Sequence, residues 1–154
     1  MASPRLHQDG EDSVKAPDFM YERPETLADA LALLGDAERE AQPLAGGQSL
    51  MPMMNFRLAA PEVLVDLNKL EELCGIERIE GGIRVGAMTR YATLMEDAQL
   101  LEHQPLLARA LPFVAHPAIR NRGTIGGSVA LADPAAEMPA LLVALGATIG
   151  AAST

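Results

Sequence analysis

Cysteine, histidine and aromatic residues are scarce in this sequence of 154 residues. Cys74 is the single cysteine, which excludes an internal disulfide, an iron–sulphur cluster held by this chain alone and a cysteine-rich zinc site. His7, His103 and His116 are not spaced as metal ligands. Tryptophan is absent and aromatic residues make up 3% of the chain, so the core must be built from aliphatic side chains and methionine.

Basic residues are also few. Twelve Lys and Arg stand against 21 Asp and Glu, and the formal net charge of −9 disfavours nucleic acids and anionic membrane surfaces as partners. The longest apolar run, residues 138–152, is interrupted by Pro139, Gly146 and Gly150. It is shorter than the roughly 20 residues of a membrane span. The first residues also lack the apolar stretch of a signal peptide. We therefore expect a cytoplasmic protein without a membrane span.

The order of apolar patterns predicts an α+β fold, without the regular alternation of a doubly wound sheet. Residues 1–16 are polar and without periodicity, so we expect a flexible N-terminal arm. Thr26 and Asp29 predict the capped start of a helix over residues 27–34, ended by Gly35. Further along, we expect strands at 63–67, 76–80 and 83–87, and Gly81-Gly82 joins the last two as a hairpin. We expect helices at 91–95, 105–113, 117–122 and 134–145, of which the first is capped by Thr89 and the last by Asp133. A further strand is expected to open at 147–150.

Two glycine-rich segments carry the clearest chemical signal. Residues 45–50 read Ala-Gly-Gly-Gln-Ser-Leu, and residues 122–128 read Arg-Gly-Thr-Ile-Gly-Gly-Ser. Adjacent glycines permit positive φ and close approach, so that successive N–H groups can converge on a phosphate. A plain turn is the alternative at each position, and neither segment is a Walker A or G-x-G-x-x-G motif. Two such segments in an acidic chain favour a diphosphate held mainly by backbone amides.

Longer stretches around both segments resemble a known family. Residues 44–58 (LAGGQSLMPMMNFRL), 63–67 and 119–144 (IRNRGTIGGSVALADPAAEMPALLVA) are similar to the FAD-binding medium subunit of the molybdenum hydroxylases. Carbon monoxide dehydrogenase and xanthine dehydrogenase are relatives in that group. The resemblance implies an FAD-binding domain of the vanillyl-alcohol-oxidase (PCMH) type with two subdomains. The first subdomain would be residues 17–70, and residues 71–154 would be the start of the second.

The resemblance also implies a cofactor, a function and partners. FAD is the implied cofactor, with its pyrophosphate wrapped by the first glycine-rich segment. The implied cofactor-binding residues are Leu44, Ala45, Gly46, Gly47, Gln48, Ser49, Leu50, Met51, Thr124, Ile125, Gly126, Gly127, Ser128 and Glu137. The implied function is that of an oxidoreductase subunit that passes electrons between iron–sulphur clusters on a small subunit and an external acceptor. Substrate would be oxidised on a separate molybdenum-containing large subunit.

The sequence also departs from the family pattern. Members often have His, Asn and Asp where this chain has Gln48, Ser128 and Glu137. They also continue well beyond the position of Thr154, so the second subdomain is expected to be incomplete. Two other functions are therefore weighed, namely a truncated, non-catalytic remnant that binds only a partner, and a nucleotide-binding module. Binding of FAD separates the first interpretation from these two.

Overall fold

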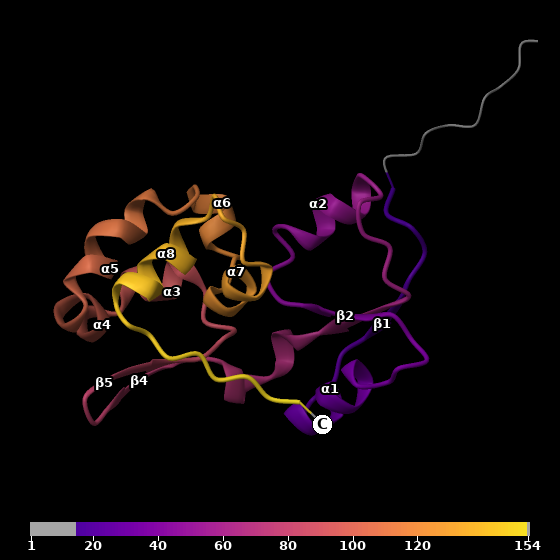
Figure 1. Cartoon of the computed structure of the whole chain (residues 1–154), viewed down its shortest axis with the longest axis horizontal. Coiled ribbons are helices and arrows are strands. Elements are labelled where there is room, and N and C mark those ends of the chain that lie inside the picture. The colour runs from indigo at the N-terminus through magenta and orange to yellow at the C-terminus, as the bar shows by residue number, and fades with distance from the viewer. Residues whose placement is uncertain (1–14, 154) are drawn as a thin grey trace, which may run out of the picture.

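The chain folds into two lobes placed side by side (Figure 1). This arrangement is that of a computed structural model, which describes residues 15–153. Residues 20–66 build the strands of the lobe on the right of Figure 1, and residues 76–144 build the lobe on its left. The arm predicted at residues 1–16 lies almost wholly outside the described residues.

A three-stranded parallel sheet organises the first lobe. Its strands are β1 (Met20–Glu22), β2 (Ala41–Leu44) and β3 (Val63–Asp66), in the order β1-β3-β2. Helices α1 (Leu27–Leu34) and α2 (Leu50–Asn55) lie on opposite sides of the sheet (Figure 1). Because all three strands run the same way, their carboxyl ends meet at one edge, which is where ligands bind in open parallel sheets.

Local sequence signals account for these elements. All four residues of β3 are buried, as expected for a central parallel strand that is covered on both faces. Thr26 caps α1 as predicted, since its hydroxyl accepts a hydrogen bond from the amide of Asp29. Ala30 on that helix packs against Val63 and Val65 in a small apolar cluster. In α2, Met54 is fully buried, so the methionine-rich segment is a packed helix.

The second lobe is mainly helical. An antiparallel hairpin of β4 (Ile76–Ile79) and β5 (Gly82–Val85) turns at Gly81, whose φ is +80°, which confirms the predicted hairpin. The lobe's core holds Tyr91, Leu94, Leu100, Leu107, Leu111, Val114, Ile125 and Met138. Most of these residues come from α3 (Tyr91–Glu96), α4 (Ala98–His103), α5 (Pro105–Ala110), η3 (Leu111–Phe113), α7 (Ile125–Leu131) and α8 (Glu137–Ala144). The short helix α6 (Pro117–Arg120) has no buried residue. Two short turns, η1 (Leu67–Lys69) and η2 (Glu71–Leu73), connect the lobes.

Several predicted boundaries in this lobe are wrong. Arg90 is the N-cap of α3, because the Thr89 hydroxyl is buried and instead exchanges hydrogen bonds with the backbone of Gly75. Helix α8 begins at Glu137 and not at residue 134. Before this helix, the carboxylate of Asp133 accepts a hydrogen bond from the amide of Ala135, and its carbonyl oxygen accepts one from the amide of Ala136. These bonds close a turn, and the backbone is extended at Ala136.

The segment after α8 also differs from the prediction. Gly146 has a φ of +63°, and the amides of Gly146 and Ala147 donate to the carbonyls of Val143 and Leu142. This pattern is a Schellman cap, which needs a left-handed residue after the helix. The strand predicted at 147–150 is wrong, since residues 147–153 have no regular structure in the described part of the chain.

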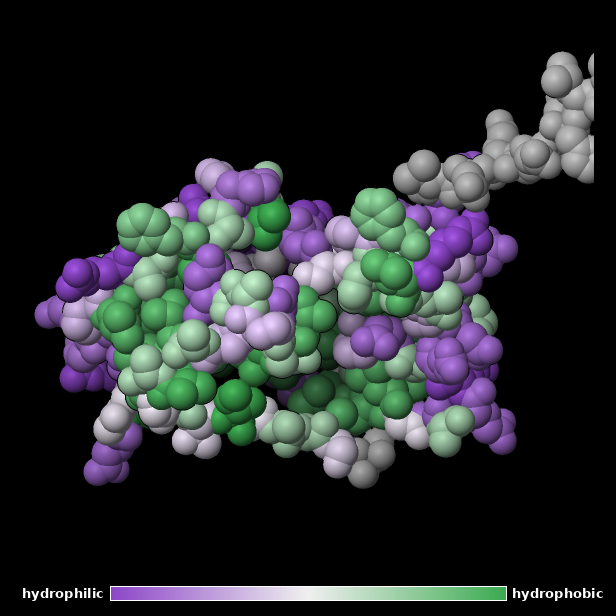
Figure 2. Space-filling view, turned by 45° about the horizontal axis from the view of Figure 1, so that its top comes forward, coloured by the Kyte–Doolittle hydropathy of each residue, from purple (hydrophilic) through white to green (hydrophobic). Residues whose placement is uncertain are grey.

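Polar and apolar side chains share the surface. Figure 2 shows hydrophobic side chains over both lobes on one face, with hydrophilic residues concentrated at the two ends. The most exposed large apolar side chains include Phe56, Leu58, Phe113 and Val143, which are 74–82% exposed. Among the residues that the structure describes, no helix is both long and apolar enough to cross a membrane.

Replacement of Leu94 by Ala should destabilise the protein. Leu94 is fully buried in the second lobe, and truncation of a buried leucine costs about 2–5 kcal/mol in lost burial and cavity formation. The matched control is Leu58→Ala, because Leu58 is 77% exposed and should change the free energy of unfolding by no more than about 0.5 kcal/mol. Urea unfolding of both variants measures the difference, and equal effects would contradict the assigned core.

Candidate functional site

A cavity of about 450 Å³ lies at the carboxyl edge of the parallel sheet, where the first lobe meets the second. Its size is in the range of small-molecule sites. Residues from the end of β2, the start of α2 and the end of β3 surround it, together with Arg122 of the second lobe. The residues that line it are Tyr21, Leu44, Ala45, Gly46, Gly47, Gln48, Met51, Pro52, Asn55, Asp66, Asn68 and Arg122.

The first glycine-rich segment borders this cavity, and Gly46, Gly47 and Gln48 are among the residues that line it. Gly47 has a φ of +71°, which turns the chain between β2 and α2. Within residues 15–153, the amides of residues 46–49 have no intramolecular acceptor. Gln48 folds back, and its Nε2 donates to the carbonyl of Gly46 at 3.0 Å. Consecutive free amides around a left-handed glycine form the kind of concave donor group that binds anions.

The second glycine-rich segment is built differently, and the predicted backbone cradle is wrong there. It forms the start of α7, with Thr124 as the N-cap. The amides of Ile125 and Gly126 donate to the carbonyls of Thr89 and Ala87. The next two amides donate to the side chain and the carbonyl of Thr124. These four amides are therefore already bonded inside the second lobe.

Close packing explains two of the glycines in these segments. A Cβ atom on Gly46 would overlap the carbonyl oxygen of Arg122 and lie 2.9 Å from Cα of Gly123. A Cβ on Gly126 would lie 2.6 Å from both Cβ and the carbonyl oxygen of Ala87. These glycines are required because backbone packs on backbone, which leaves no room for a side chain.

A polar cluster at the end of β3 completes the site. Asp66 is 5% exposed and accepts hydrogen bonds from the hydroxyl of Tyr21 and from the side chain and backbone of Asn68. Nε of Arg23 lies 3.4 Å from its Oδ2. Burial by itself raises the pKa of Asp66, but these hydrogen bonds and the positive charge of Arg23 outweigh burial, so the pKa is below its ordinary value. Asp66 is therefore a carboxylate in the folded protein at neutral pH.

The sequence analysis missed this cluster. Tyr21 and Asp66 are 45 residues apart, so only the topology of the sheet brings them together. One signal was present in the sequence, because Asp66 directly follows the apolar run of residues 63–65. Polar residues at that position of a parallel strand lie at the ligand-binding edge.

The predicted site residues fall into two groups. Those of the first segment that line the cavity are Leu44, Ala45, Gly46, Gly47, Gln48 and Met51, with Ser49 and Leu50 at the start of α2 beside them. Those of the second lobe, namely Thr124, Ile125, Gly126, Gly127, Ser128 and Glu137, do not line the cavity. A Cβ on Gly127 would lie 3.5 Å from Cβ of Ala45, and the Ser128 hydroxyl accepts a hydrogen bond from Tyr91 at 2.6 Å. Glu137 is exposed in the first turn of α8.

Comparison with known proteins gives the family. Residues 17–154 match the family described as the FAD binding domain in molybdopterin dehydrogenase. The chain belongs to this family. FAD is therefore its cofactor class, and the predicted α+β FAD-binding fold with a partial second subdomain is confirmed.

The relatives are subunits of dehydrogenases. The chain is 45% identical over 140 residues to the 6-hydroxypseudooxynicotine dehydrogenase complex subunit alpha of Paenarthrobacter nicotinovorans, covering 91% of this chain and 47% of the relative. It is 44% identical over 129 residues to the carbon monoxide dehydrogenase medium chain of Hydrogenophaga pseudoflava, covering 84% and 45%. The chain thus spans slightly less than half the length of these relatives.

Solved structures agree with the fold. A carbon monoxide dehydrogenase from Hydrogenophaga pseudoflava superposes with a TM-score of 0.82 at 44% identity, over 84% of this chain and 45% of that one. Quinoline 2-oxidoreductase from Pseudomonas putida 86 gives a TM-score of 0.80 at 44% identity, over 83% and 45%. The two-lobed arrangement is therefore that of this family.

Replacement of Gly46 by Ala should lower stability by about 1–3 kcal/mol, the usual cost of overpacking, because the new methyl group meets backbone that cannot rotate away. Gly82→Ala is the matched control, since a Cβ there meets nothing within 4 Å and its φ is not left-handed. Urea unfolding should separate the two variants clearly. If they have the same midpoint, the lobes do not pack as described.

Replacement of Asp66 by Asn should cost about 1.5–3 kcal/mol at pH 7, the range for hydrogen bonds to a charged group. Folding lowers the pKa of Asp66, so its carboxylate stabilises the folded protein at every pH above its ordinary pKa of 3.8. This stabilisation is lost as the pH falls through the lowered pKa of the folded state. The stability difference between wild type and Asp66→Asn should therefore shrink below about pH 4. Urea unfolding across pH 2–7 tests this, with the exposed Asp18→Asn as the control. A difference that does not change with pH would contradict the assignment.

Proposed function

We propose that this chain is the FAD-binding part of an electron-transfer subunit of a molybdenum-containing hydroxylase. In this role it relays electrons between iron–sulphur clusters on a small partner subunit and an external acceptor. Substrate is oxidised on a large partner subunit that carries the molybdenum cofactor. The names of the relatives, which include a complex subunit and a medium chain, support membership of such an assembly.

One observation carries the proposal at this site. Within residues 15–153, the amides of residues 46–49 have no intramolecular acceptor, and Gly46, Gly47 and Gln48 line a cavity at the carboxyl edge of the sheet. A pyrophosphate suits this donor set, because its charged oxygens accept several N–H bonds at once. Arg122 lines the same cavity and supplies a positive charge from the second lobe. In this chain with a net charge of −9, backbone amides and one arginine replace an extended basic patch.

The remaining predicted residues have supporting roles in this proposal. Leu44 and Met51 give the cavity apolar walls, and Ser49 and Leu50 begin the helix that follows the amides. Residues 124–127 back the first segment through packing and not through their amides. We propose that Ser128 and Glu137 contact the cofactor through their side chains.

Bound FAD would supply the electron transfer, which none of the protein side chains described here provides. The chain's own contribution is to bind and orient the cofactor. The Tyr91 ring holds the Ser128 hydroxyl in place. The pKa of Tyr91 is raised, mainly by burial. The hydrogen bond to Ser128 lowers this pKa, and the nearby Glu137 carboxylate raises it further. The phenol therefore stays protonated at neutral pH and remains a donor.

Titration of the purified protein with FAD, followed by flavin fluorescence, tests the proposal. Gly47→Ala should weaken binding roughly ten- to hundredfold, because it disturbs amides that bond a charged phosphate at about 1.5–3 kcal/mol each. Gly81→Ala is the matched control. Both glycines have positive φ, +71° and +80°, so both variants carry similar backbone strain, but Gly81 lies in the distant hairpin turn.

Equal FAD affinity in the two variants would contradict the assignment of the pyrophosphate site. A protein that binds ATP or ADP but not FAD would instead be a nucleotide-binding module. One that binds neither would be a non-catalytic partner. The electron relay is tested separately in the assembled complex, where reducing substrate should bleach the flavin absorbance only when both partner subunits are present.

A further inference from the structure

Two carbonyl groups in the first glycine-rich segment are bonded by side-chain amides. Nδ2 of Asn68 donates to the carbonyl of Ala45 at 2.9 Å, and Nε2 of Gln48 donates to the carbonyl of Gly46 at 3.0 Å. A trans peptide group is planar, with its C=O and N–H pointing in opposite directions. The carbonyl of Ala45 shares a peptide plane with the amide of Gly46. Likewise, the carbonyl of Gly46 shares a plane with the amide of Gly47.

The Asn68 side chain is itself held in one orientation by three neighbours. Its Nδ2 faces two acceptors, the carbonyl of Ala45 and Oδ1 of Asp66, the latter at 2.6 Å. Its Oδ1 faces a donor, Nη2 of Arg90, at 3.3 Å. Donors and acceptors match only in this orientation. Arg90 also donates through Nη1 to the carbonyl of Asn121 at 2.8 Å, so Asn68 is tied to the second lobe next to Arg122.

We propose that Asn68 and Gln48 are positioning residues that aim the Gly46 and Gly47 amides at the ligand. Each side-chain amide holds one carbonyl and so sets the direction of the N–H on the far side of the same peptide plane. Bonding of the carbonyl also polarises the peptide group and strengthens its N–H as a donor. Gln48 thereby acts through the loop and not as a direct ligand. That the ligand is FAD rests on the proposed function.

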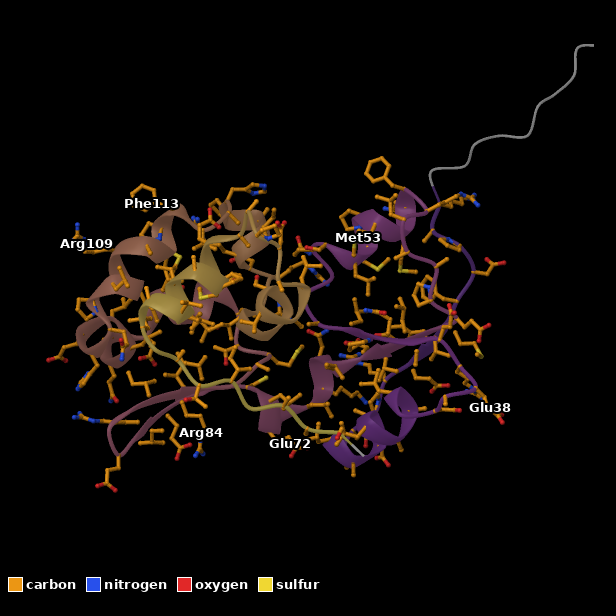
Figure 3. The ribbon with its side chains drawn as sticks, in the orientation of Figure 1. Glu38, Met53, Glu72, Arg84, Arg109 and Phe113 are labelled. Atoms are coloured by element: carbon orange, nitrogen blue, oxygen red, sulfur yellow. The ribbon has the colours of Figure 1, made fainter. Side chains whose placement is uncertain are left out.

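Asn68→Leu and Gln48→Met test this, because both keep the size of the side chain and remove the donor without adding charge. Each should weaken FAD binding roughly tenfold, the equivalent of one hydrogen bond near 1.4 kcal/mol. Gln48→His restores a neutral N–H donor and should recover most of the affinity. Arg84→Ala is the control, since Arg84 pairs with Glu77 on the hairpin, away from the first lobe's sheet and α2 (Figure 3).

Nuclear magnetic resonance of the unliganded protein gives a second readout that general destabilisation would not produce. In ¹H–¹⁵N spectra, Asn68→Leu should shift the amide signal of Gly46 most among the glycines, and Gln48→Met that of Gly47. This pattern, together with the loss of affinity, supports the inference. Glycine signals that do not move in this pattern overturn it, whether or not FAD binds. A parent protein that binds no FAD contradicts the proposed function instead.

Discussion

Backbone contact between Gly46 and the Arg122–Gly123 peptide is the constraint on which the rest of the site depends. No side chain fits between these two backbone segments, so the lobes are in direct backbone contact here. The contact lies between the end of β2 and the segment that precedes α7. Gly46 and Arg122 line the same cavity, so this contact joins its two sides. A side chain at position 46 would have to push the two lobes apart.

The two glycine-rich segments look alike in sequence and do opposite things with their amides. In the first, the side chains of Asn68 and Gln48 bond the carbonyls of Ala45 and Gly46, and the amides of residues 46–49 have no acceptor within the described part of the chain. In the second, the N–H groups bond Thr89, Ala87 and Thr124, and hold the second lobe together. The first segment lines the cavity, whereas the second is bonded within its own lobe. This division is consistent with a ligand that is gripped mainly from the first lobe.

The parts of the fold that could be predicted from the sequence are those set by neighbouring residues. The cap at Thr26, the helix that follows it, the buried strand β3 and the turn at Gly81 all depend on residues within a few positions of each other. The first glycine-rich segment was also found, because adjacent glycines after an extended segment are a local signal. The family resemblance extended this reading to the cofactor.

The parts that could not be predicted depend on distant contacts. The role of Asn68 requires Ala45, which is 23 residues away, and Arg90, which is 22 residues away. For the second segment the sequence predicts a backbone cradle for a diphosphate, with a plain turn as the alternative, because Thr-Ile-Gly-Gly also fits a capped helix start. The bonds of its amides to Thr89 and Ala87 depend on residues more than 30 positions away. At Asp133 the ambiguity is local, since an Asp-Pro pair fits both a helix cap and the Asx turn that it forms here.

The distribution of the two tyrosines has a spectroscopic consequence. The chain has no tryptophan, so its intrinsic ultraviolet emission comes from Tyr21 in the first lobe and Tyr91 in the second. Each hydroxyl donates to a partner in its own lobe, Asp66 for Tyr21 and Ser128 for Tyr91. The hydrogen bond to Asp66 is the main cause that raises the pKa of Tyr21, whereas burial is the main cause for Tyr91. Separation of the lobes as rigid bodies leaves both hydrogen bonds intact, so each chromophore reports the integrity of its own lobe.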